Sequence, residues 1–255
     1  MKTTKTVVQN DGKFVTYFIE NGIWRKAFEC GEYAWGKTNF KHVQQLVKQF
    51  KGDKPNVVVD VGASIGAATL QYSGWADKVV SFEPCDSSRH VLLQNIQQNN
   101  IKNVYVESVG LSDIYCISNL QIIGGNESMN FITENASART VPVRLISFDD
   151  WVVDKAVIYD FIKVDVEGLE MKVLLGMVNT IKRHQPVFQI EMKDKWLKRN
   201  NTSSEEIWDF FNNRGYKCFS SPTKIVEREL VASVHRQKAD LYFVKTDECG
   251  FSSYS

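Results

Sequence analysis

Short apolar runs alternate with amphipathic stretches between residues 56 and 192, and this rhythm is the main structural signal in the chain. The apolar runs are rich in β-branched residues, which is typical of strands buried on both faces. Strands are expected in these runs, at 56–62, 78–84, 103–110, 156–166 and 186–192. Amphipathic helices are expected between them, at 66–72, 87–100 and 168–181. Strand and helix alternating in this way predict an α/β protein with a parallel, doubly wound sheet.

The N-terminal part of the chain has a different pattern. Residues 13–29 alternate in short β-like runs around Asn21-Gly22, a dipeptide that favours a hairpin turn. Residues 40–50 place their apolar side chains at helical spacing. We therefore predict that residues 1–50 form a hairpin and helix extension that serves as a lid or substrate cap.

A second departure lies inside the α/β pattern. Residues 111–157 contain a Gly-Gly pair and a tract rich in Ser, Asn and Thr, so we expect an irregular insertion or lid there. Within it, 141–147 is strand-like, and Ser147 is placed to begin a short helix. After a helix at 203–216, the runs "KCFSS" and "ADLYFVK" predict two last strands, which completes one domain over 51–255.

Composition and charge exclude several classes of protein. The 43% apolar and 24% charged residues are ordinary for a globular protein, and a net charge of +1 argues against a dedicated nucleic-acid binder. The five cysteines are scattered without a CxxC pair, so neither a disulfide framework nor a zinc site is expected. We see no signal peptide and no run near the roughly 20 apolar residues that cross a bilayer, so we expect a cytoplasmic protein without a membrane partner.

The stretch "DVGASIG" at 60–66 forms a glycine-bearing turn after the first buried strand. Such a turn lets a ligand approach the backbone and the N–H groups of the following helix. The spacing is G-x-x-x-G and not the G-x-G-x-x-G of NAD-binding turns, and Asp60 suits a cationic or hydroxyl-rich ligand better than a pyrophosphate. S-adenosylmethionine carries an ammonium, a sulfonium and a ribose but no phosphate. The alternative is that Gly62 and Gly66 only allow tight packing of strand and helix.

Acidic residues follow two other strands. Glu83 ends the second strand, where a carboxylate can accept both hydroxyls of a ribose, although it could also be a simple strand terminator. In "IKVDVEGLE", Asp165 lies at the carboxyl end of the fourth strand and Glu167 in the turn after it, so both are expected to face the ligand crevice. The alternative is that these two acids only cap the following helix. Glu170 falls in the first turn of the next helix, where an acid complements the helix dipole.

Six segments occur in the order and spacing found in one enzyme family: "VVVDVGASIG", "VVSFEP", "VGLSD", "ISFDDW", "FIKVDVEGLEMKVLLGM" and "PVFQIEM". Over residues 56–192 the chain resembles FkbM-type methyltransferases, although Ser64 stands where Asn is common in that family. The resemblance implies a class I, Rossmann-like methyltransferase fold with seven strands, mostly parallel with an antiparallel last strand, and helices on both faces. It also implies methylation of hydroxyl groups on sugars, polyketides and related small molecules, with S-adenosylmethionine as the cofactor.

With this cofactor, we expect the methionine end near the glycine turn, the ribose at Glu83 and the adenine past the third strand. The expected cofactor-binding residues are Asp60, Gly62, Ala63, Ser64, Gly66, Glu83, Pro84, Ser108, Val109 and Gly110. Asp165 is the first choice for the base that removes the proton of the acceptor hydroxyl, with Glu167 as its partner or alternative. A less favoured route uses Mg²⁺ held by Asp165, Glu167 and Glu191.

The favoured function is thus O-methylation of a sugar, glycan or other small molecule. A nicotinamide-dependent oxidoreductase is the first alternative, disfavoured by the missing G-x-G-x-x-G. A non-catalytic binding domain on the same fold is the second. A nucleic-acid methyltransferase is weakened by the near-neutral charge and by the lack of an N/D-P-P-Y/F tetrapeptide.

Overall fold

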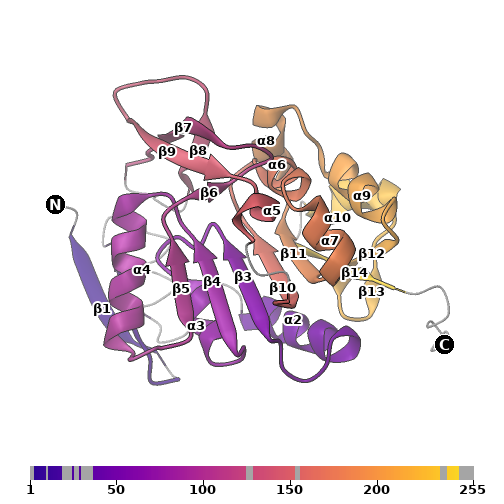
Figure 1. Ribbon diagram of the computed structural model, residues 1–255, viewed down its shortest axis with the longest axis horizontal. Coiled ribbons are helices and arrows are strands. Elements are labelled where there is room, and N and C mark those ends of the chain that lie inside the picture. Colours follow the sequence, from indigo (N-terminus) through magenta and orange to yellow (C-terminus); the bar gives the residue numbers. More distant parts are fainter. Residues whose placement is uncertain are drawn as a thin grey trace.

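A central sheet with helices on both faces forms the body of the protein in the computed structural model, and a smaller sheet lies at its upper edge (Figure 1). Among the described residues, no helix has the length and apolarity that a membrane span requires. The structure describes residues 3–9, 11–18, 25, 29, 37–124, 129–152, 156–235 and 240–246.

The central sheet has the strand order β13-β12-β14-β11-β10-β3-β4-β5. Its strands are β3 (Val57–Val61), β4 (Lys78–Phe82), β5 (Val104–Glu107), β10 (Tyr159–Val164), β11 (Val187–Glu191), β12 (Tyr216–Ser221), β13 (Lys224–Ile225) and β14 (Asp240–Lys245). Strands β5, β4, β3, β10 and β11 run parallel, while β14 is antiparallel to β11 and β12. In the described part of the chain this sheet has eight strands and not seven, because the short β13 pairs with β12 at the edge.

The strand order reverses between β3 and β10. From β3 the chain builds outward through β4 to β5, and then returns to place β10 on the other side of β3. At such a reversal the connections leave the two neighbouring strands in opposite directions, which opens a crevice at their carboxyl ends. The fold therefore places the ends of β3 and β10 where a ligand can enter.

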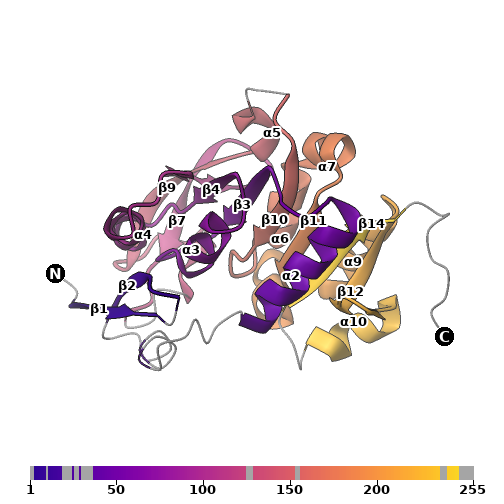
Figure 2. The ribbon, with the colours of Figure 1, turned by 90° about the horizontal axis from the view of Figure 1, so that it is seen from below.

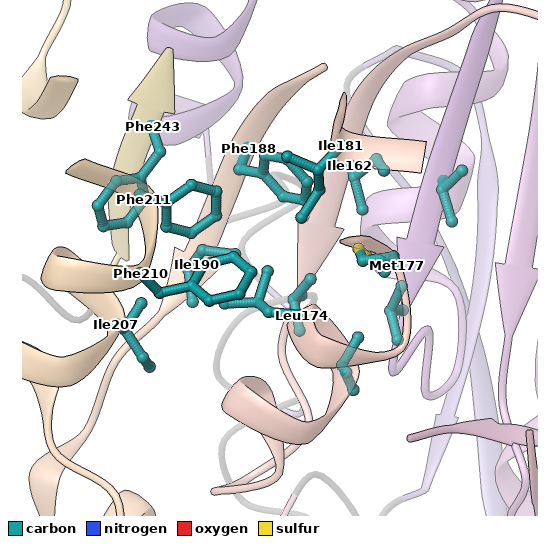
Figure 3. Packing of buried hydrophobic residues seen from close by; sticks show 14 of the residues in the cluster. Ile162, Leu174, Met177, Ile181, Phe188, Ile190, Ile207, Phe210, Phe211 and Phe243 are labelled. Atoms are coloured by element: carbon teal, nitrogen blue, oxygen red, sulfur yellow. The ribbon is translucent and has the colours of Figure 1, made fainter. Parts of the chain in front are cut away.

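Alternation along β3 explains why both faces of the sheet are covered. Val57, Val59 and Val61 belong to one apolar cluster, whereas Val58 belongs to another on the opposite face. Helices α2 (Lys37–Phe50), α3 (Ala67–Ser73) and α4 (Asp86–Gln98) pack on the Val58 side, as Figure 2 shows for α2 and α3. On the other side lie α5 (Phe148–Trp151), α6 (Glu170–Leu175), α7 (Val178–His184), α9 (Ser204–Asn212) and α10 (Arg228–His235). Their aliphatic and aromatic side chains interlock with the sheet (Figure 3).

The single helix predicted over 168–181 is wrong: the structure has two, α6 and α7, which are separated at Gly176. A Cβ atom at Gly176 would lie 1.9 Å from the carbonyl oxygen of Ser112. The helix ends there because a distant loop touches its backbone, and no local pattern carries that contact. The short helix predicted after Ser147 is confirmed by α5, whose Asp150 N–H donates to the Ser147 hydroxyl at 3.0 Å.

The stretch expected to be irregular instead contains an ordered sheet with the strand order β6-β9-β7-β8. Its strands are β6 (Gly110–Leu111), β7 (Cys116–Gln121), β8 (Phe131–Thr133) and β9 (Thr140–Ile146). The strand predicted at 141–147 is confirmed as β9, but β7 and β8 were missed. Side chains of β7 are mostly half-buried on both faces, so the strand lacks a clear alternation of apolar and polar residues.

An antiparallel hairpin precedes α2. It joins β1 (Thr4–Val8) to β2 (Phe14–Phe18), and Gly12 supplies the positive φ of +81° that its turn requires. The predicted turn at Asn21-Gly22 lies outside the described residues, as does most of the segment between β2 and α2. The Asn95 carboxamide of α4 fastens the hairpin: it accepts from Thr16 N–H at 2.6 Å and donates to the Ile65 carbonyl at 2.8 Å.

Replacing Asn95 with Ala should lower the free energy of unfolding by about 2–3 kcal/mol, because the buried Thr16 and Ile65 backbone groups lose their partner. Urea denaturation measures the change. Gln97→Ala, an exposed position of the same helix, is the matched control and should stay within about 0.5 kcal/mol of the parent chain. Equal losses in the two variants would show that the carboxamide does not hold the hairpin.

Candidate functional site

Two adjoining cavities lie at the carboxyl ends of β3 and β10. The larger cavity, about 180 Å³, extends under α2 and α3 and includes Trp196 in its wall. The smaller cavity, about 70 Å³, lies between the central sheet and the β7–β9 strands and includes Glu83 and Gly110. They meet at a junction whose shared wall residues are Gly62, Ser64, Asp165 and Glu167. Four residues singled out from the sequence thus lie together at the reversal of strand order.

The glycine turn after β3 is shaped by contacts with two other segments. Gly62 has a φ of +82°, and a Cβ there would lie 2.0 Å from the carbonyl oxygen of Asp165. Gly66 has a φ of +91°, and its Cβ would meet Leu92 of α4 at 2.4 Å. Both glycines therefore allow close packing, and Gly62 in particular lets the turns after β3 and β10 touch. Ala63 and Ser64 between them line the larger cavity, while Gly66 lines neither cavity.

Glu83 connects this turn to the end of β4. Its Oε2 atom accepts from the Ser64 N–H and its Oε1 atom from the Cys85 N–H, both at 2.8 Å. Burial raises the pKa of Glu83 to about 7, although these two N–H groups favour the ionised form. Each carboxylate oxygen can still accept a further hydrogen bond. Glu83 thus fixes the turn and, with Pro84, contributes to the wall of the smaller cavity.

A polar row crosses the buried face of the sheet that α2 and α3 cover. Asp60 of β3 lies opposite Lys163 of β10, which in turn lies opposite Gln189 of β11. The Lys163 Nζ atom is 2.8 Å from Asp165 Oδ2 and 3.9 Å from Asp60 Oδ1. Asp60 is fully buried and accepts a hydrogen bond from Thr69 at 2.6 Å. It lines neither cavity and reaches the site only through its contact with Lys163.

Three carboxylates surround the junction. Asp165, Glu167 and Glu191 each offer an oxygen within 4.8 Å of the other two. Lys163 pairs with Asp165, and Lys193 lies 2.8 Å from Glu191 Oε1. Glu167 has neither a hydrogen bond nor an ion pair through its carboxylate to another described residue, although 8% of the residue is exposed. The sequence grouped these acids correctly, but only the structure separates the paired ones from Glu167.

Electrostatics separate the three acids further. Burial raises the pKa of Glu167 to about 7, and the charge of Asp165 adds to this. Burial also disfavours the charged form of Asp165, but Lys163 more than compensates and holds the pKa of Asp165 below its usual value. Burial and the nearby charge of Asp165 raise the pKa of Glu191. Near neutral pH, Glu167 is therefore the junction carboxylate best able to exchange a proton.

The turn that carries Glu167 is strained and well supported. Glu167 has a φ of +56°, uncommon for a residue with a side chain, and Gly168 follows with +114°. The Glu170 Oε1 atom accepts from Gly168 N–H at 3.1 Å and from Val166 N–H at 3.3 Å. Glu170 lines neither cavity, which agrees with the helix-start role expected for it.

The remaining predicted residues lie farther out. Gly110 lines the smaller cavity, but Ser108 is exposed and Val109 packs against the apolar core, so neither of them lines either of these two cavities. Sequence reasoning missed Lys163 and Lys193, and also Asn39 and Asp240, which lie near the two ends of the chain. A lysine inside the apolar run "IKVDV" was the available signal, because a buried lysine needs an acidic partner.

Residues near both ends of the chain contribute to the larger cavity, and the carboxylate of Asp240 connects them. Asp240 of β14 accepts hydrogen bonds from the side-chain amides of Asn39 in α2 and Gln189 in β11. All three side chains belong to the wall of the larger cavity. Part of the N-terminal extension is therefore a wall of the site.

Comparison with known proteins places the chain among methyltransferases. A family model described as "Methyltransferase FkbM domain" matches residues 60–218, more than half of the chain. No curated protein matches this chain. The solved FkbM methyltransferase from Methylobacillus flagellatus KT is 17% identical with a TM-score of 0.46; the match covers 80% of this chain and 49% of that one, so this chain spans about half its length.

Two further solved structures are similar to this chain. A putative methyltransferase from Streptococcus mutans in complex with SAH is 13% identical, has a TM-score of 0.47, and is matched over 82% of this chain and 97% of its own. A putative rRNA-methylase from Clostridium thermocellum is 10% identical, has a TM-score of 0.48, and is matched over 83% of this chain and 98% of its own.

Gly62→Ala should destabilise the protein by at least about 2 kcal/mol more than Gly52→Ala. Gly52 is the matched control because its φ of +111° also disfavours a side chain, yet a Cβ there would meet nothing within 4 Å. The difference between the variants isolates the collision with Asp165. Urea denaturation gives both values, and similar losses would contradict the close approach of the two turns.

Proposed function

The chain belongs to the FkbM methyltransferase family, and on that basis we propose that it transfers the methyl group of S-adenosylmethionine to a hydroxyl of a sugar, a glycan or another small molecule. The observation that carries the choice of an alcohol is the unpaired carboxylate of Glu167 at the junction of the two cavities. An alcohol becomes a good nucleophile only when its proton is removed, so a buried base beside the methyl donor is the feature that such a reaction needs.

The two cavities suit the two ends of the reaction. Leu111, Leu145 and Phe131 give the smaller cavity an apolar wall for an adenine, and Glu83 can accept ribose hydroxyls there. At the junction, acidic groups favour the positive sulfonium. The larger cavity has room for the methionine end and for an acceptor, and its amide and carboxylate groups suit a hydroxylated molecule.

In the proposed step, the acceptor oxygen attacks the methyl carbon in line with the sulfonium. The new bond is O–CH₃, the C–S bond breaks with its electron pair going to sulfur, and the hydroxyl proton passes to Glu167. We favour Glu167 over Asp165 as the base, reversing the order suggested by the sequence, because the ion pair with Lys163 makes Asp165 a weak base. Asp165 then helps to orient the site.

A divalent cation held by Asp165, Glu167 and Glu191 is a second candidate. Their oxygens are close enough to share an ion, and only oxygen ligands are offered, which suits Mg²⁺. The two lysines weigh against it, because Lys163 and Lys193 already bring positive charge to the oxygens of Asp165 and Glu191. The base mechanism therefore remains our first proposal.

A thermal-shift experiment tests the cofactor. S-adenosylhomocysteine at 100 times its Kd should stabilise the protein by about 2.7 kcal/mol, visible as a rise in Tm, while NADH should leave Tm unchanged. Stabilisation by NADH alone would instead indicate the nicotinamide-dependent oxidoreductase. Transfer of a labelled methyl group to a panel of sugars and glycans then identifies the acceptor, and failure with every hydroxyl compound despite cofactor binding would favour a binding domain.

Glu167→Gln should lower kcat by about 10²–10⁴-fold, because the amide cannot accept the hydroxyl proton. With the parent enzyme, the rate should fall as the pH drops below about 7, since protonated Glu167 is no longer a base. The variant should lose this limb of the pH profile while it binds S-adenosylhomocysteine within about threefold of the parent.

Glu170→Gln is the matched control, because its amide oxygen can still accept from Gly168 and its side chain lines neither cavity. Its rate should stay within about threefold of the parent. A chelator separates base from metal: EDTA should leave the parent rate unchanged, and activity restored by Mg²⁺ after chelation would favour the cation route.

A further inference from the structure

Arg199 lies outside both cavities and contacts one wall residue of each. Its guanidinium carbon lies 3.9 Å from the ring centre of Phe131 and 3.9 Å from that of Trp196. The guanidinium therefore contacts both rings at once. Phe131 comes from β8 and Trp196 from α8 (Asp194–Leu197), so the stack joins segments that are far apart in the sequence.

The two rings belong to different cavities. Phe131 lines the smaller cavity, and Trp196 lines the larger one. Both cavities share Glu167, whose charge is felt at Arg199. Arg199 itself is exposed and lines neither cavity, so it can act on the site through the two rings and through its charge near Glu167.

The segment that carries Trp196 and Arg199 is fixed on its other side. The Asn200 side chain donates to the Gly168 carbonyl at 2.9 Å. A Cβ at Gly168 would lie 2.4 Å from the carbonyl oxygen of Trp196, so the backbones of the two segments touch. Residues 194–200 therefore rest on the turn that carries Glu167, and Arg199 ties this assembly to β8.

We propose that Arg199 is a positioning residue for methyl transfer: it stacks between Phe131 and Trp196 and thereby couples occupation of the smaller cavity to the arrangement of the larger one. This inference rests on the proposed function, in which the cofactor's nucleoside packs against Phe131. A nucleoside that holds Phe131 in place also holds Arg199 and Trp196. Cofactor binding thus orders the wall that the acceptor meets.

The geometry favours arginine at this position. A guanidinium is flat and weakly hydrated, so it can offer both faces to aromatic rings, whereas the ammonium of lysine is a compact point charge. Lys195 provides a comparison within the same segment. Its Nζ atom lies 4.8 Å from the ring centre of Trp196, and no contact with a second ring is found for it among the described residues.

The test uses Arg199→Ala, Arg199→Lys and the matched control Lys195→Ala, with S-adenosylhomocysteine as the probe. Cation–π contacts with two rings at an exposed site suggest a Kd weakened about tenfold in both Arg199 variants and unchanged in the control. Hydrogen–deuterium exchange provides the second readout. In the parent chain the ligand should slow exchange in peptides covering both 129–133 and 194–200, and in the Arg199 variants only in 129–133.

Each contrary result has a distinct meaning. Protection of 194–200 that persists in Arg199→Ala would overturn the coupling. Wild-type behaviour of Arg199→Lys would overturn the stacking role, because charge near Glu167 would then suffice. Loss of coupling in Lys195→Ala would also overturn the special role of Arg199. If the parent chain shows no protection in either segment and no thermal shift, the proposed function fails; protection of 129–133 alone would reject only the coupling.

Discussion

A lysine buried in the middle of the sheet is the constraint on which the site depends. Lys163 lies on a buried strand between the apolar residues Ile162 and Val164, and an unpaired ammonium there would be very costly. Its partners are Asp60 in the facing strand and Asp165 at the end of its own. The parallel register that places Asp60 opposite Lys163 is therefore also the register that brings the turns after β3 and β10 together.

That pairing also decides the roles of the acids. Asp165 forms an ion pair with Lys163, and Glu191 contacts Lys193, so two of the three carboxyl groups have a lysine partner. Glu167 is held in the same place without a partner, by a turn with positive φ that Glu170 supports through backbone N–H groups. Strain and an unpaired carboxyl group are both unfavourable for stability, and they are found together where the proposed chemistry occurs.

The sequence predicts the parts of this arrangement that depend on local pattern. Strands β3 and β10 are recognisable because apolar, β-branched runs are typical of strands buried on both faces. The acids at their ends stand out in the sequence because a buried carboxylate without a partner is costly, so such a residue indicates a partner or a function. The pairing of Lys163 with Asp60 could not be predicted, because it depends on which strands become neighbours and in what register. The break at Gly176 and the stack on Arg199 likewise depend on contacts between distant segments.

The charge distribution suggests why an unpaired Glu167 suits methyl transfer from a sulfonium. Before the proposed step, a positive sulfonium and a negative Glu167 face each other across the junction. Afterwards the sulfur is a neutral thioether and Glu167 carries the proton, so both charges disappear together. In a site of low dielectric, a reaction that disperses charge in its transition state needs little solvent reorganisation, provided that the other charges stay fixed. Lys163 and Lys193 help to fix them: Lys163 holds Asp165 in an ion pair, and Lys193 lies 2.8 Å from Glu191 Oε1, and the step leaves both contacts unchanged.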